Sequence, residues 1–224
     1  CIRMELGLIP AGEFLMGSDD GEDDEKPVHK VIISKPFYMG KYEVTQEQYE
    51  QVMGANPSEF KGVKNPVETV SWDDAKEFCK KLSQITGYTI TLPTEAQWEY
   101  ACRAGTTAKW HSGDEEYLLD DYAWYEWLGW HNSHPIGQKR PNSFGLFDMH
   151  GNVWEWCSDW GSDKYYSESP NVDPVGPDTG LFRVHRGGYW GRKADKCRSA
   201  ERDWFVPDYR YGSIGLRVVA VRRD

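Results

Sequence analysis

The most reactive side chains of this 224-residue chain are five cysteines, and their spacing limits what they can do. They are Cys1, Cys79, Cys102, Cys157 and Cys197. No two of them have the CxxC spacing of a redox pair or a zinc site. A lone buried thiol behaves as a small apolar side chain, which is what we expect of the internal four. The sequence also shows no nucleophile elbow, phosphate loop or HExxH motif.

The first residue, Cys1, suggests a different chemistry. Maturation of a bacterial lipoprotein leaves an N-terminal cysteine that carries lipid. A lipid anchor at Cys1 would make the protein extracytoplasmic, as a cell-surface lipoprotein. A trimmed chain is the alternative, and no signal peptide is visible. No apolar run approaches the roughly 20 residues that a transmembrane helix needs.

The charge balance excludes one class of partner. The net charge is −10 and the pI is about 5.1, whereas nucleic-acid binding needs clustered Lys and Arg. Part of the acid forms one run at residues 19–25, which we interpret as a solvated loop. The run lacks the ligand spacing of an EF-hand.

Local patterns predict short elements in an α+β domain. Strands are expected over residues 13–16 and 28–34. Capping boxes start helices at Thr45, Ser71 and Thr94, each with its partner three residues on. In the second helix Ala75, Phe78, Cys79, Leu82 and Ile85 share one face.

The remainder of the chain has less pattern. A short turn is expected after Ala194. Residues 114–178 are aromatic, glycine-rich and irregular, which in a compact domain is typical of a binding or active-site surface. Residues 214–222 read as a strand, with Ile214, Leu216, Val218 and Ala220 on one face. With no repeat and no linker, the prediction is a single domain over residues 1–224.

Several stretches resemble one family in the same order along the chain. They are residues 9–18, 42–49, 66–75, 92–101, 145–156, 183–188 and 214–217. The most specific is GLFDMHGNVWEW at 145–156. Together they resemble the formylglycine-generating enzyme (sulfatase-modifying factor) domain. The resemblance implies a C-type-lectin-like fold with little regular secondary structure and with paired N- and C-terminal strands. A fold does not define a function, so each site is considered separately.

The enzymatic site of that family is incomplete in this chain. The family's enzyme holds copper on two cysteines five residues apart, shortly after a Gly-Gly pair. Here Gly187-Gly188 is followed by Arg192 at the first cysteine position, and only Cys197 remains. One thiolate cannot form a two-thiolate copper site. We therefore expect no copper and no catalytic residues.

The resemblance also implies calcium around the GNVWEW stretch. The ligands would be the side chains of Asp148 and Glu155 with the carbonyls of Gly151 and Val153, a set of hard oxygens that Ca²⁺ prefers. The alternative is that Glu155 accepts hydrogen bonds from the backbone and Asp148 is a turn residue. Trp154 and Trp156 are expected in the core.

Residues 189–213 have an unusual composition. Scaffold positions such as Trp190, Cys197, Arg202 and Pro207 alternate with positions that hold a mixture of aromatic, charged and very small residues. This second set comprises Tyr189, Gly191, Arg192, Lys193, Asp195, Lys196, Glu201, Asp203, Trp204, Phe205, Val206, Tyr209, Tyr211, Gly212 and Ser213.

The mixture is typical of a selected binding surface, because aromatic side chains give contact area at low entropic cost. It resembles the C-terminal variable region of the proteins that diversity-generating retroelements alter. The alternative is that Trp204, Phe205 and Tyr209 fill the core or line an ordinary groove. If the segment is variable, most of the set should converge on one exposed face, with Trp204 and Tyr209 as anchors.

The sequence thus predicts a non-catalytic binding protein whose residues 189–213 contact an unidentified protein or other surface ligand. The first alternative is a formylglycine-generating-enzyme-like enzyme or pseudo-enzyme of unknown chemistry. The second is a sugar-binding module.

Overall fold

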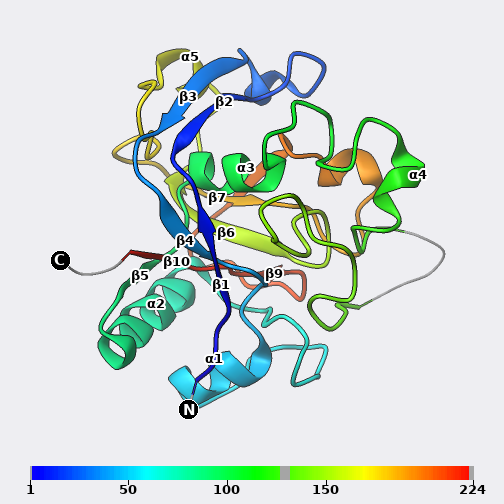
Figure 1. Cartoon of the computed structure of the whole chain (residues 1–224). Coiled ribbons are helices and arrows are strands. Elements are labelled where there is room, and N and C mark those ends of the chain that lie inside the picture. The colour runs from blue at the N-terminus through cyan, green and yellow to red at the C-terminus, as the bar shows by residue number, and fades with distance from the viewer. Residues whose placement is uncertain (1, 127–131, 222–224) are drawn as a thin grey trace.

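The computed structural model describes residues 2–126 and 132–221. Its first sheet contains β1 (Leu6–Ile9), β4 (Phe37–Gly40), β10 (Val219–Val221) and β5 (Thr89–Thr91), in the order β1-β4-β10-β5. All neighbours are antiparallel. The first and last strands therefore lie in one sheet, as expected, with β4 between them (Figure 1).

The described residues form two further sheets. β2 (Gly12–Met16) pairs with β3 (His29–Ile33), close to the ranges predicted from sequence. The larger sheet has the order β8-β7-β6-β9 and comprises β6 (Trp154–Trp160), β7 (Arg183–Arg186), β8 (Arg202–Phe205) and β9 (Ile214–Gly215). The strand expected over 214–222 is thus split between two sheets.

The three predicted helices begin where their capping boxes place them. α1 (Gln46–Met53), α2 (Trp72–Thr86) and α3 (Glu95–Arg103) each have an N-cap hydroxyl that accepts from the amide three residues on. In α2 the buried face ends at Leu82 and Ser83. Ile85 is exposed, so the prediction that it belongs to this face is wrong.

The other helical pieces are short. They are α4 (Glu116–Leu119), α5 (Tyr165–Glu168) and two 3₁₀ turns, η1 (Asp23–Glu25) and η2 (Ala194–Cys197). The turn η2 confirms the one expected after Ala194. Among the described residues no helix combines the length and apolar character of a membrane span.

Strand β6 is the main element that the sequence did not predict. It lies in the stretch expected to be irregular, yet it forms the middle of the larger sheet. Residues 154–157 are all buried, so the strand shows no alternation of polar and apolar side chains. Trp154 and Trp156 are both in the core, as predicted.

Helices cover two of the sheets. α2 lies against β5 of the first sheet, and its Phe78 and Leu82 pack in one core cluster with Ile90 and Ala220. α3 contacts β2, β6 and β7, so it covers one face of the larger sheet (Figure 1). The other face of that sheet carries residues of the predicted variable segment.

Candidate recognition surface

The larger sheet presents two chemically different faces. Trp156, His185 and Asp203 are opposite one another on β6, β7 and β8, so their side chains share one face. The next row, Glu155, Arg186 and Arg202, points to the other face, toward α3.

The face away from α3 is aromatic. The Phe205 ring stacks on His185 with 4.9 Å between centroids, and Tyr209 lies 4.3 Å from Phe205. Tyr211 follows at 6.1 Å from Tyr209. His185 is fully buried, neither ring nitrogen has a hydrogen-bond partner, and burial lowers its pKa to about 3. The ring is therefore a neutral part of the aromatic cluster.

A loop after β7 adds a charged rim. Gly187 and Gly188 both have positive φ, and a Cβ on Gly188 would collide with the Cys197 sulfur, so this sharp exit from the strand requires glycine. The loop brings the Arg192 guanidinium 5.7 Å from the Tyr189 ring. Burial raises the pKa of Asp203, and the backbone amide of Trp204 and the charge of Arg192 offset part of that rise.

Tyr189, Phe205 and Tyr209 all pack against the same core cluster, and we call them and their neighbours the recognition surface. Its members come from both ends of residues 189–213 and are half-buried or exposed. They are Tyr189, Arg192, Asp203, Phe205, Tyr209 and Tyr211. Gly191 lies under the Tyr189 ring, Lys193 and Asp195 are exposed on the turn that follows Arg192, and Val206 is exposed directly after Phe205.

Five predicted members do not belong to this surface. Gly212 and Ser213 are buried. Trp204 alternates with Asp203 and Phe205, so it lies on the opposite side of β8, where its indole packs against Gly161. Glu201 is only 5% exposed and, like Lys196, is held in ion pairs. The expectation that Trp204 and Glu201 share one exposed face with the others is wrong.

Lys196 and Glu201 instead belong to a clamp with the N-terminal acidic run. Arg198 donates to both carboxylate oxygens of Glu25 at 2.6 and 2.7 Å and to Glu201 at 2.7 Å. Lys196 pairs with Glu22 at 2.7 Å. Glu25 is fully buried, so the interpretation of the whole run as a solvated loop is also wrong.

The face toward α3 is ionic. Arg186 pairs with Glu99 and lies 3.2 Å from Glu95, while Arg202 donates to both oxygens of Glu95 at 2.7 and 2.8 Å. Arg103 donates to Glu99 at 2.8 Å. All five side chains are buried. The sequence analysis missed this network because its members are up to 107 residues apart.

The donors needed for a copper site are not present here. Cys197 is fully buried, and burial raises the pKa of its thiol. Arg192, at the other expected position, is exposed. The cysteines of the described part of the chain are free and buried. A single protonated thiol beneath the surface does not fit a two-thiolate copper site.

The two predicted calcium-binding carboxylates differ in whether they have an oxygen without a hydrogen-bond partner. Asp148 is buried, its Oδ2 accepts from the Gly137 amide at 2.7 Å, and its Oδ1 has no partner, which suits a cation. Glu155 already accepts from Arg217 at 2.7 and 3.0 Å and from Trp98 at 2.7 Å. Burial raises the pKa of Asp148 to about 6.

A further buried carboxylate lies next to this stretch. Glu43 accepts from the Asn152 amide at 2.7 Å and from the backbone amide of Val153 at 3.2 Å. Burial, followed by the charge of Asp148, raises its pKa. Glu43 thus holds the GNVWEW loop in place, a role that the sequence analysis did not assign.

The comparisons with known proteins agree with this architecture. Residues 4–222 match the sulfatase-modifying factor enzyme 1-like domain, and the chain belongs to this family. In sequence it is 32% identical to a formylglycine-generating enzyme of Streptomyces coelicolor, covering 93% of this chain and 87% of that protein.

Two solved structures are also similar. Treponema denticola variable protein 1 superposes with a TM-score of 0.91 at 33% identity, over 97% of this chain and 95% of that one. PvdO from Pseudomonas aeruginosa does so with a TM-score of 0.86 at 30% identity, over 96% and 93%. An enzyme and a variable protein are thus similar to this chain at almost equal identity, so the local chemistry must distinguish them.

Proposed function

We propose that this protein is a non-catalytic ligand-binding protein that uses the recognition surface on a rigid C-type-lectin-like scaffold. The observation that carries the proposal is that Tyr189, Phe205 and Tyr209 pack against one core cluster. The exposed Arg192 and Tyr211 lie beside them. The similarity to a variable protein over nearly the whole chain supports it.

The exposed members of the surface, Arg192 and Tyr211, suit diversification because their side chains lie outside the core. Directional bonds concentrate on the α3 face and in the clamp, whereas the recognition surface is held by ring contacts. Exposed substitutions typically change stability by under about 0.5 kcal/mol. We propose that a retroelement diversifies this segment and that the protein is displayed at the cell surface.

The coding locus provides the direct test. The expected finding is a second, nearly identical copy of the 3′ end beside a reverse-transcriptase gene. The two copies should differ only at adenines, in codons for exposed positions such as Arg192 and Tyr211, with the buried Arg202 unchanged. A locus without such a copy would contradict the diversification, and differences concentrated at buried codons would contradict the surface.

The second candidate function is formylglycine generation or a related chemistry, which the family match favours. It is tested by incubating a Cys-x-Pro-x-Arg peptide with the protein, copper and oxygen. Because Arg192 stands at the first cysteine position, we expect no conversion above a control without protein. The Streptomyces enzyme is the positive control. Turnover by this chain would overturn the non-catalytic assignment.

We also propose a structural calcium ion bound through Asp148, supported by its unpartnered Oδ1. An ion that binds only the folded state stabilises it by about 2.7 kcal/mol when its concentration is 100 times Kd. Thermal melts with calcium and with chelator should differ for the wild type and coincide for Asp148→Asn. Equal melting points for the wild type in both buffers would refute the site.

Lipid attachment at Cys1 is a further proposal, on a residue that lies outside the described part of the chain. The mass of the N-terminal peptide from a cell-membrane fraction tests it. A diacylglyceryl-modified cysteine is expected, and an unmodified peptide would exclude the anchor.

A further inference from the structure

A loop outside the variable segment lies against both of its ends. It comprises residues 56–62, between α1 and α2, and we call it the α1 loop. At one end the Phe60 ring meets the Trp190 ring edge-on, with 5.7 Å between centroids, and Trp190 contacts Tyr189 at 5.4 Å. At the other end Phe60 lies next to Gly212, where an added Cβ would be 3.2 Å from its ring. The α1 loop therefore joins the two ends of the recognition surface.

Two buried polar side chains hold the α1 loop in place. The Phe60 carbonyl accepts from Gln46 Nε2 at 2.8 Å, and the Phe60 amide donates to Glu68 Oε1 at 2.8 Å. Gln46 Oε1 also accepts from the Gly62 amide at 3.0 Å and from the Asn56 side chain at 2.9 Å. Gln46 and Glu68 are both buried. A loop fixed in this way loses little conformational entropy when a ligand binds to it.

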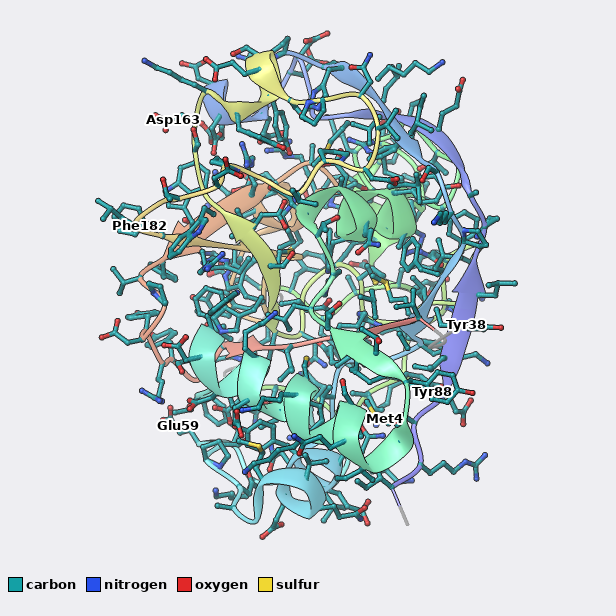
Figure 2. The ribbon with its side chains drawn as sticks, turned by 90° about the vertical axis from the view of Figure 1, so that its left-hand side faces the viewer. Met4, Tyr38, Glu59, Tyr88, Asp163 and Phe182 are labelled. Carbon is teal, nitrogen blue, oxygen red and sulfur yellow. The ribbon has the colours of Figure 1, made fainter. Side chains whose placement is uncertain are left out.

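Glu59 is an exposed carboxylate on the α1 loop. In Figure 2 it lies on the side of the molecule opposite Met4 and Tyr38. Within residues 2–126 and 132–221, no Lys, Arg or His forms an ion pair with it. The charge of Glu59 is therefore available to a ligand.

The surroundings of Glu59 select the kind of ligand. Its carboxylate and the Phe60 ring both lie against Gly212, which directly follows the exposed Tyr211. A carboxylate beside an aromatic ring offers an ion pair and a cation–π contact to one cationic group. On an exposed surface of aromatic and charged residues, which is typical of a protein–protein interface, a Lys or Arg side chain supplies that group.

Gly212 links the Glu59 carboxylate to the variable segment. Gly212 does not have the positive φ that requires glycine, so its backbone accepts other residues. A Cβ at this position would, however, lie 2.7 Å from Glu59 Oε2. Because that oxygen is at the end of a flexible side chain, the carboxylate can move away. The residue at position 212 therefore determines where the charge of Glu59 lies.

We infer that Glu59 is a constant contact of the recognition surface that pairs with a Lys or Arg side chain of a protein ligand, and that the variable residue at position 212 sets the position of its carboxylate. This inference rests on the proposed binding function and adds a residue that lies outside the variable segment. The variable residues then change specificity partly by moving a charge that does not itself vary.

The test uses the full chain and defined probes. The protein is panned against a phage-displayed random dodecapeptide library. Selected peptides are titrated against the wild type, Glu59→Gln, Gly212→Ala and the double variant Glu59→Gln/Gly212→Ala. Glu50→Gln, at an exposed carboxylate on α1, is the matched control. Tyr209→Ser/Tyr211→Ser tests the recognition surface itself.

We expect the selected peptides to be enriched in Lys or Arg and to bind less tightly as the salt concentration rises. Glu59→Gln should weaken their binding by about tenfold, because hydrogen bonds to a charged group are the stronger ones, while Glu50→Gln leaves it unchanged. Gly212→Ala should also weaken binding. The double variant should lose little more than Glu59→Gln alone, because both substitutions act on one carboxylate.

The outcomes separate this inference from the proposed function. Peptides that lose binding with the tyrosine variant but not with Glu59→Gln would overturn the inference and retain the recognition surface. Additive losses in the double variant would overturn the link between position 212 and Glu59. If Gly212→Ala melts early, Glu59→Gln decides alone. Failure to select any peptide, or binding insensitive to every variant, would contradict the inference and the proposed function together.

Discussion

The two faces of the β8-β7-β6-β9 sheet are stabilised by different kinds of interaction. Toward α3, five buried charged residues are joined by ion pairs with defined geometry, such as Arg202 with Glu95. On the other face, the rings of Phe205 and Tyr209 stack with 4.3 Å between their centroids. Removing one partner of a buried ion pair is strongly destabilising, whereas a substitution at an exposed position such as Tyr211 usually changes stability little. The fold thus separates the residues that must stay fixed from those that can change.

Removing one buried charge should have the largest effect. Arg186→Met leaves Glu99 and Glu95 without their shared partner inside the protein. Breaking a buried pair in this way costs about 3–5 kcal/mol. Urea denaturation should show that loss or an unfolded protein, while Lys80→Ala, which breaks an exposed pair with Glu77, has almost no effect. A change below about 1 kcal/mol would show that the network does not stabilise the sheet.

A second substitution tests whether the loss of stability depends on the burial of the side chain or on the face of the sheet that it occupies. Trp156 lies on the aromatic face but is fully buried, and its indole N–H donates to the Val70 carbonyl at 2.9 Å. Trp156→Ala should cost about 3–5 kcal/mol in a thermal melt. Tyr211→Ala, on the same face but exposed, should change the melting point little. Equal effects of the two would contradict the division of this face into core and recognition surface.

The pH dependence of stability tests the α3 side. Burial, followed by the nearby charge of Glu95, raises the pKa of Asp159 to about 7. The folded protein therefore binds this proton more tightly than the unfolded chain, and Asp159 lowers stability progressively as the pH rises from about 4 to 7. The slope is at most about 1.4 kcal/mol per pH unit for one group.

Asp159→Asn should flatten that slope between pH 4 and 7, measured by urea unfolding at several pH values. The exposed Asp208→Asn is the control and should leave the wild-type slope unchanged. Asp148, whose pKa is raised to about 6, adds to the slope in the same direction, so only the difference between variant and wild type isolates Asp159. An unchanged slope in Asp159→Asn would contradict the raised pKa.

The smallest effect is expected for the exposed residues of the variable segment. Changing Arg192, Lys193, Asp195 and Tyr211 together to Ser should alter the free energy of unfolding by under about 0.5 kcal/mol per site. Thermal melts measure this. Loss of folding would show that these side chains are structural and that the segment is not free to vary.

What could be predicted from sequence was local. The capping boxes at Thr45, Ser71 and Thr94 are complete within four residues, so they placed three helices correctly. The family motifs predicted the fold correctly. They did not show that Trp204 points away from Phe205, because the phase of a strand is set by its neighbour in the sheet.

The buried Glu25 and Glu201, with their partner Arg198, show the same limit. Composition places charged residues on the surface, and only the contact between residues 25 and 198 reverses that expectation. Strand β6 was missed because both of its faces are covered, which removes the alternation that identifies a strand.

The position of β10 has a consequence for how variants are produced in the cell. This last strand fits between β4 and β5, so the sheet that contains β1 has a gap until the end of the chain has been synthesised. A stop codon or frameshift within residues 189–213 would remove β9 and β10 together. Such a product should fail to fold and be degraded, so that only chains that include β10 accumulate as folded protein.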